Sequence, residues 1–129
     1  MFIKIESKDK ITRGEGSQYS IDNYLTKNMV GNISVAVSHL NGKIEKTKNL
    51  ESDRIYYFIN ANAKFELDNE IIHVNDGDVI FISKNTFYSI EGKFDAVLIN
   101  TPAFDLKNEI SEMWAYEKWK MRTWILIEH

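Results

Sequence analysis

The stretch RIYYFINANAKFELDNEIIHVNDGDVIFI, residues 54–82, decides the fold class of this chain. Its first part, residues 54–60, is rich in aromatic and β-branched side chains, which favour a central β-strand. Two further apolar runs flank Asp68-Asn69, so this pair predicts a hairpin. Asp76-Gly77 predicts a second turn, and the apolar run at residues 78–82 follows it. Short strands separated by such turns are typical of an all-β protein.

The same pattern continues on both sides of this stretch. Further strands are expected at residues 2–5, 32–40, 87–90 and 94–100. Asn41-Gly42 predicts a turn after the second of these, because this dipeptide tolerates positive φ at both positions. The series of short strands from residue 2 to about residue 100 therefore predicts a barrel or a sandwich.

Length and composition limit the number of domains and the classes of function. The chain has 129 residues, of which 43% are hydrophobic and 27% are charged, as expected of one globular domain with a real core. Its formal net charge is −3 and its basic residues are scattered, which argues against nucleic-acid binding. Cysteine is absent, so disulfides and thiolate chemistry are excluded. Without an apolar leader or a membrane-spanning window, we expect a cytoplasmic protein that does not bind membranes.

The chain changes character after Pro102, its only proline. Residues 109–124 contain helix formers with apolar residues near helical spacing, and all three tryptophans lie in this region. A late strand at residues 123–127 is the alternative, and both can occur in succession. We expect one domain over residues 1–129, with a barrel at about residues 2–106 and a Trp-rich tail, helical or extended, at about residues 107–129.

Two spaced motifs give the chain a family resemblance. Residues 42–61 keep the spacing of G-x5-H-x-H-x3,4-E-x6-G, and residues 77–92 keep that of G-x5-P-x-G-x2-H-x3-N. By these motifs the chain resembles the cupin superfamily over about residues 30–106. The resemblance implies an all-β fold, the cupin-type double-stranded β-helix or jelly-roll barrel. It also implies a homodimer, because small cupins commonly dimerise and an aromatic tail suits an interface.

Most residues that hold a metal in cupins are replaced. The two histidine positions of the first motif fall on Lys48 and Leu50 or, with the longer spacer, on Thr47 and Asn49. Arg54 stands at the glutamate and Tyr88 at the histidine of the second motif. A guanidinium has no lone pair to give a metal. The resemblance therefore implies a cupin without a metal site and without a cofactor.

The same positions predict a ligand-binding site. Arg54 and Lys48 could clamp a carboxylate or a phosphate, with Arg54 as a bidentate fork. Tyr88 could hydrogen-bond a ligand or donate a proton, and Tyr56 could stack on a sugar ring. The alternative is that Arg54 pairs with a local carboxylate and Lys48 is solvated.

Histidine offers one further candidate. His39 shares its strand face with Val35 and Val37, and we expect it to point into the barrel mouth. There, His39 and Tyr88 would be the candidate acid–base residues, the alternative being a structural histidine. His73 is out of phase with its apolar neighbours and is expected on the solvent face.

Two ligand-related functions follow from these candidates, and a structural scaffold whose Trp-rich tail and barrel face form a homodimer is a third possibility. The first is metal-independent binding of a small molecule in the barrel, of carbohydrate or small-anion type. The second is a metal-independent sugar or sugar-nucleotide isomerase or epimerase, so the residues leave open whether the chain is an enzyme. Catalysis predicts that His39, Tyr88 and Arg54 share one cavity, whereas a scaffold predicts a barrel plugged by Leu50 and the aromatic residues.

Overall fold

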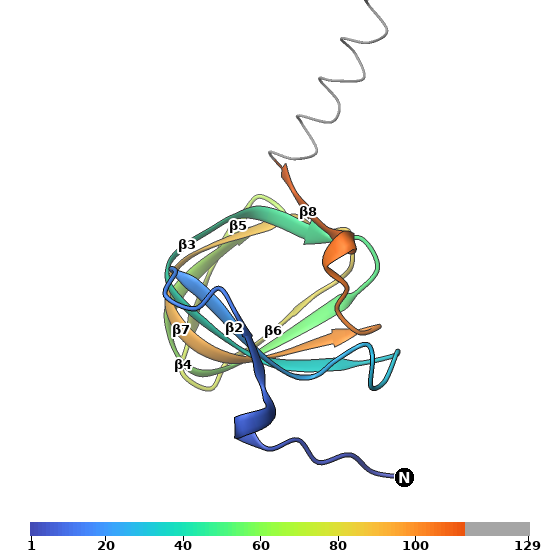
Figure 1. Cartoon of the computed structure of the whole chain (residues 1–129). Coiled ribbons are helices and arrows are strands. Elements are labelled where there is room, and N and C mark those ends of the chain that lie inside the picture. The colour runs from blue at the N-terminus through green and yellow to red at the C-terminus, as the bar shows by residue number, and fades with distance from the viewer. Residues whose placement is uncertain (113–129) are drawn as a thin grey trace, which may run out of the picture.

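The computed structural model describes residues 1–112 and consists of one curled, eight-stranded antiparallel sheet (Figure 1). The main strand order is β1-β2-β3-β7-β4-β5, while β6 pairs with β4 and β8 pairs with β3. The strands are β1 (Ile11–Arg13), β2 (Tyr19–Leu25), β3 (Ser34–Asn49), β4 (Asp53–Leu67), β5 (Glu70–Asn75), β6 (Val79–Ile82), β7 (Tyr88–Thr101) and β8 (Glu109–Ser111). Two short 3₁₀ helices, η1 (Ser7–Asp9) and η2 (Leu106–Asn108), precede β1 and β8. The sheet curls into a barrel shape without closing, and the predicted all-β class is confirmed.

Three long strands form the centre of the sheet, with β7 hydrogen-bonded to β3 on one side and to β4 on the other. β4 carries a bulge, because its register against β7 shifts between Phe58 and Asn60. Before the bulge, even-numbered residues such as Tyr56 are buried, and after it odd-numbered residues such as Phe65 are buried. The extra residue thus keeps the apolar side of one strand facing inward while the strand bends.

Two predictions made from the sequence are wrong, and two glycines explain why. Asn41-Gly42 was predicted to be a turn, and residues 87–90 and 94–100 were predicted to be separate strands. Instead Gly42 and Gly92 face each other in the β3–β7 ladder, with φ values of 145° and 135°. A side chain at Gly92 would collide with the carbonyl oxygen of Asn62 and lie 2.6 Å from the Ala63 Cα atom. Gly92 therefore allows a close approach of two backbones, and both glycines let the strands continue at positive φ values that other residues rarely adopt.

The hairpin predicted at Asp68-Asn69 is confirmed, with φ values of 49° and 62° that suit the two central residues of a tight turn. The turn at Gly77 is confirmed as well, with φ of 81°. The strand predicted at residues 2–5 is wrong: this segment has no strand partner, and Phe2 is 91% exposed.

An aromatic cluster fills one half of the barrel. Phe58, Phe65 and Phe94 are fully buried and pack mainly edge to face, at centroid distances of 5.3–5.8 Å. Tyr56 and Tyr88 lie beside them and mark where this core ends. Opposite the aromatic rings, β3 presents the small residues Ser34, Ala36 and Ser38 to the interior. A cavity lies beside this cluster and is lined in part by Tyr56 and Tyr88.

The segment between β7 and β8 returns along the barrel and is tied to the loops beside it (Figure 1). The Ala103 amide donates a hydrogen bond to the Gly31 carbonyl, and the Ser52 hydroxyl donates one to the Pro102 carbonyl. β8 then pairs with the end of β3, so the sheet continues to residue 111. The part of the Trp-rich tail at residues 113–129 lies outside the described residues.

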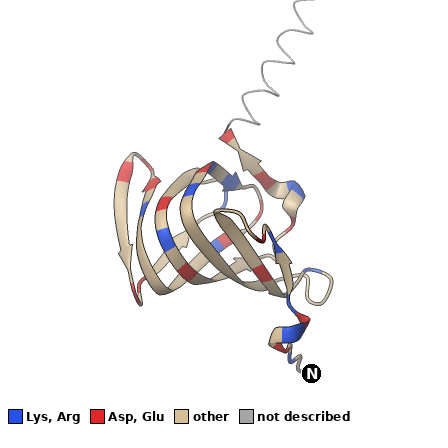
Figure 2. Cartoon of the chain, turned by 60° about the vertical axis from the view of Figure 1, so that its left-hand side comes forward, with Lys and Arg blue, Asp and Glu red and all other residues tan. Residues whose placement is uncertain are grey.

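Acidic and basic residues are interspersed along the strands (Figure 2). A group of exposed apolar side chains lies on β4, β5 and β6: Tyr57, Ile59, Ile71, Val79 and Phe81. The homodimer stays a prediction. Within residues 1–112, no helix is long and apolar enough to cross a membrane.

Candidate functional site

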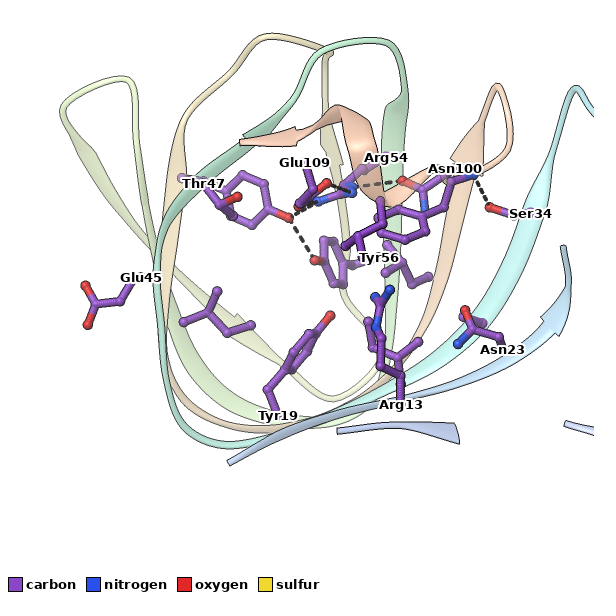
Figure 3. A pocket seen from close by; sticks show the side chains of 17 residues that line it. Arg13, Tyr19, Asn23, Ser34, Glu45, Thr47, Arg54, Tyr56, Asn100 and Glu109 are labelled. Carbon is purple, nitrogen blue, oxygen red and sulfur yellow. Dashed lines mark hydrogen bonds and ion pairs between the residues drawn. The ribbon is translucent and has the colours of Figure 1, made fainter. Parts of the chain in front are cut away.

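A cavity of about 280 Å³ occupies the end of the barrel next to the aromatic cluster. Side chains from β1, β2, β3, β4, β7 and β8, and from the segment between β7 and β8, line it (Figure 3). Its apolar lining consists of Ile21, Ala36, Ile44, Leu98, Phe104 and Leu106. Its polar lining is concentrated around one buried arginine.

Arg54, at the start of β4, is only 4% exposed and is fully engaged by neighbours. Its Nη1 and Nη2 atoms donate to the two carboxylate oxygens of Glu109 at 2.8 and 2.6 Å, which forms a bidentate ion pair. Nη1 also donates to the Tyr88 hydroxyl at 2.6 Å, and Nε donates to the Asn100 side-chain oxygen at 2.8 Å. Arg54 therefore joins β4, β7 and β8 inside the barrel.

Neutral side chains contact both members of the Arg54–Glu109 ion pair. The Asn49 amide donates to the second carboxylate oxygen of Glu109 at 3.0 Å. Burial opposes the charge on Arg54, but the interaction with Tyr88 and the hydrogen bonds to Glu109 outweigh it and raise the pKa of Arg54. The two opposite charges of the pair offset each other in the cavity wall.

Tyrosine hydroxyls extend this network into the cavity. The hydroxyls of Tyr56 and Tyr88 lie 3.0 Å apart, and both side chains are almost fully buried. Burial, reinforced by the nearby Tyr88, raises the pKa of Tyr56 and also that of Tyr19, whose phenol points into the cavity from β2 (Figure 3). Tyr19 and Tyr56 therefore keep their protons at neutral pH and act as hydrogen-bond donors.

The structure brings together three of the residues singled out by sequence: Arg54, Tyr56 and Tyr88. Lys48 is not among the residues that line the cavity, and its ammonium nitrogen lies 4.6 Å from the centroid of the Phe87 ring. The expected pairing of Arg54 with Lys48 around one anion is therefore not formed. The partner of Arg54 is a carboxylate, but the distant Glu109 rather than a neighbour in sequence.

The placement expected for His39 is corrected. The interior face of β3 is formed by Ser34, Ala36, Ser38 and Leu40, so His39 lies on the outer face. There its Nδ1 atom lies 2.5 Å from the Asp95 Oδ1 atom, and its Nε2 atom lies 2.9 Å from the Asp22 Oδ2 atom. His39 thus shares no cavity with Tyr88 and Arg54, while the exposed His73 lies on the solvent side as expected.

Sequence reasoning missed Glu109, Asn100 and Arg13 as cavity residues. Glu109 lies 55 positions from Arg54, and only the return of the segment after β7 brings the two together. The available signal was the charge itself: a buried arginine in a strand requires a carboxylate somewhere in the fold.

The donor atoms present do not fit the metal site that the motif resemblance to cupins implies, three imidazoles and one carboxylate. No histidine lines the cavity described here, and its partly buried carboxylate, Glu109, is bound by Arg54. Within residues 1–112, no group of three or more histidine or carboxylate side chains could hold a metal ion. The expectation of a metal-free, cofactor-free protein stays a prediction.

Comparison with known proteins places this fold. No protein-family model matches the chain, and no curated protein matches it either. Among solved structures, the Streptomyces protein Pac13, described as a nucleoside dehydratase, matches with a TM-score of 0.76 and 19% identity, over 86% of this chain and 91% of that one. A variant of Pac13 with uridine matches equally well, with a TM-score of 0.76 and 18% identity over 86% and 90% of the two chains.

Two further structures widen the comparison. KdgF from Halomonas sp. matches with a TM-score of 0.68 and 12% identity, over 81% of this chain and 97% of that one. Oxalate decarboxylase from Bacillus subtilis matches with a TM-score of 0.72 and 16% identity, over 87% of this chain but 33% of the larger one. These are all cupin-fold proteins, so this chain has the cupin fold. At these identities the likeness is one of fold.

Proposed function

We propose that this chain binds a small hydroxyl-rich molecule, of the size of a nucleoside or a monosaccharide, in the cavity beside Arg54. The observation that carries the proposal is a cavity of about 280 Å³ whose wall combines phenols, an amide and aliphatic side chains. Small-molecule sites are concave and mostly apolar, with a few placed polar groups, and this volume is at the lower end of their range. A ligand of one or two rings suits it.

The polar groups favour a ligand with hydroxyls. The phenols of Tyr19 and Tyr56 can donate hydrogen bonds, and the Asn100 side chain adds an amide beside them. The aliphatic side chains Ile44 and Leu98 supply apolar surface for the face of a ring. The fold shared with Pac13, for which structures with uridine exist, makes a nucleoside the first ligand to test.

Binding is better supported than catalysis. An isomerase or epimerase needs a group that accepts a proton as well as one that donates. Among the described lining residues, the carboxylates are Glu109, which is bound by Arg54, and Glu45, whose carboxylate is directed away from the other labelled side chains (Figure 3). The alternative therefore lacks an evident base in the part of the chain that the structure describes.

The test is a titration of the ¹⁵N-labelled full chain with uridine and a panel of nucleosides and monosaccharides, followed by NMR. We expect amide shifts at Tyr56, Tyr88 and Asn100. Replacement Tyr56→Phe should weaken binding about three- to tenfold, the effect of one neutral hydrogen bond. Tyr57→Phe is the matched control, because the neighbouring Tyr57 is 46% exposed on the opposite strand face and should leave affinity unchanged. Absence of cavity shifts with every member of the panel would contradict the proposal.

A further inference from the structure

Arg13, in the short strand β1, is placed on the cavity side by the sheet register. It pairs with Ile21 in β2, and Ile21 is buried and lines the cavity. The preceding residue, Thr12, pairs with Asp22 and bonds to it on the outer face. Because successive strand residues point to opposite faces, Arg13 must point inward, and it does so in Figure 3.

The charges that line the cavity do not cancel. Two arginines and two glutamates contribute to its wall: Arg13, Arg54, Glu45 and Glu109. Arg54 and Glu109 neutralise each other in their bidentate pair. Glu45 is exposed, with its carboxylate directed away from the cavity (Figure 3). Among the described residues, the remaining cavity charge is therefore the guanidinium of Arg13.

Arg13 is available to a ligand. Within residues 1–112, Arg13 forms no ion pair. Its guanidinium group packs on an aromatic ring instead, with the guanidinium carbon 4.9 Å from the centroid of the Phe104 ring. The carbon of Arg54 lies 5.8 Å from the same centroid, so the free and the neutralised arginine belong to one site. Stacking on Phe104 orients the guanidinium while leaving its N–H groups free to donate in the plane of the fork.

The rest of the interior is already satisfied. In the described part of the chain, no buried side-chain nitrogen or oxygen lacks a hydrogen-bond partner. An anionic ligand group is therefore not needed to complete the buried Arg54 cluster. Arg13, by contrast, is exposed at the cavity mouth and has no carboxylate partner within residues 1–112, so its N–H groups are available to an anionic ligand group.

We propose that Arg13 binds a terminal oxyanion of the ligand, a phosphate monoester or a carboxylate, while the hydroxyl-rich body of the ligand occupies the cavity beside Tyr56 and Tyr88. This inference rests on the proposed function and narrows its ligand class to anionic nucleosides or sugar acids and phosphates. A guanidinium matches both oxyanions through paired, charge-assisted hydrogen bonds.

The experiment compares matched ligand pairs on the full chain by NMR and calorimetry: uridine with uridine 5′-phosphate, and galactose with galacturonate. Within at least one pair, the anionic member should bind about tenfold or more tightly than the neutral member. Arg13→Gln should reduce that ratio to about one. Lys8→Gln is the matched control for net charge, because Lys8 is exposed and pairs with Glu6 outside the cavity. It should keep the ratio.

The outcomes separate the two proposals. A preference in the uridine pair identifies a phosphate, and one in the galactose pair identifies a carboxylate. If neutral ligands bind but Arg13→Gln leaves the ratio unchanged, or no pair shows a preference, the role of Arg13 is overturned and the proposed function stands. If no member of either pair binds, the proposed function fails for these classes. Titration with inorganic phosphate then tests whether Arg13 binds an oxyanion. A saturable shift of the Arg13 Nε–H signal that is weakened by salt supports this role, and an unmoved signal overturns it.

Discussion

Two charged clusters lie on opposite faces of the same sheet, and they use similar chemistry in different surroundings. The inner cluster joins Arg54 to Glu109, with Tyr88 and Asn100 as neutral partners. The outer cluster joins His39 to Asp22 and Asp95, with the Thr12 and Asn60 side chains as neutral partners of the carboxylates. Each cluster connects strands that are distant in sequence.

The difference between them is solvent. The largest contrast is between the two cations, because the Arg54 side chain is 5% exposed and that of His39 is 38% exposed. Among the carboxylates, Asp95 is 41% exposed, whereas Glu109 and Asp22 are similar at 22% and 17%. Buried charges are costly when their partner is lost, and exposed pairs are screened by water. The inner cluster also uses a cation that does not titrate near neutral pH, while the outer cluster uses one that does. The inner cluster is therefore a fixed wall for the cavity, and the outer one is a pH-dependent clamp.

The largest loss of stability is expected when the ion pair of the inner cluster is broken. Glu109→Gln leaves the Arg54 charge buried without its carboxylate, and we expect the free energy of unfolding to fall by about 3 kcal/mol or more. Asp95→Asn in the outer cluster should cost about 1 kcal/mol or less. Urea denaturation of both variants at pH 7 measures the two losses.

A control variant isolates the role of burial. Glu91→Gln removes a carboxylate that is 61% exposed and lies 3.6 Å from the Lys64 ammonium, and stability should change by less than about 0.5 kcal/mol. Equal losses for Glu109→Gln and Asp95→Asn would mean that burial is not what separates the two clusters.

A smaller effect is expected from the neutral partners. Tyr88→Phe removes the hydroxyl that accepts from Arg54 and lies 3.0 Å from the Tyr56 hydroxyl, so a buried phenol loses a partner. We expect a loss of about 1–2 kcal/mol in the free energy of unfolding. The equivalent outer change, Asn60→Ala, removes an exposed hydrogen bond to Asp95 and should cost less than about 0.5 kcal/mol. Thermal and urea unfolding of the two variants would reveal whether this order is reversed.

The contrast also explains what the sequence could predict. The all-β class follows from short apolar runs and turn residues, and the cupin spacing of the motifs points to Arg54 and Tyr88, which do line the cavity. The partners of Arg54 could not be inferred in the same way. Glu109 reaches Arg54 through β8, whose pairing with β3 depends on the whole return path of the chain.

The inner face of β3 was misjudged because strand alternation alone does not say which face is inside. Alternation correctly groups Val35, Val37 and His39. The two valines suggested that this group lies inside. In the structure, the buried face instead carries Ala36, which lines the cavity, and Ser38. The hydrophobicity of the side chains along one strand therefore does not by itself identify its buried face.

The smallest expected effect concerns pH and tests the outer clamp. The hydrogen bond to Asp95, supported by that to Asp22 and opposed by partial burial, raises the pKa of His39 above its usual 6.5. The hydrogen bond to His39 lowers the pKa of Asp95, and for Asp22 the bonds to His39 and Thr12 outweigh the opposing effect of burial. Lys10 and Lys93 also act on these carboxylates and lower their pKa values further.

The direction of the pH dependence of stability follows from whether the folded or the unfolded state binds each proton more tightly. Because the folded state raises the pKa of His39, its contribution to stability is complete below about pH 6.5 and is lost as the pH rises through the folded value. Because the folded state lowers the pKa values of both aspartates, their contribution is present above about pH 4 and is lost on acidification through the folded values. The clamp should therefore be strongest between about pH 4 and pH 6.5.

Urea unfolding between about pH 5 and pH 9 checks this window. For the unchanged chain we expect the free energy of unfolding to decline above about pH 6.5 by less than about 1 kcal/mol, because His39 is 38% exposed and water screens the pairs. His39→Gln should remove this alkaline decline, whereas His73→Gln, on an exposed position of β5, should keep it. If His39→Gln and the unchanged chain show the same slope, His39 is not the titrating group. If they differ as expected, the sheet carries a fixed charge pair inside and a titratable one outside, and pH alters the clamp without altering the cavity wall.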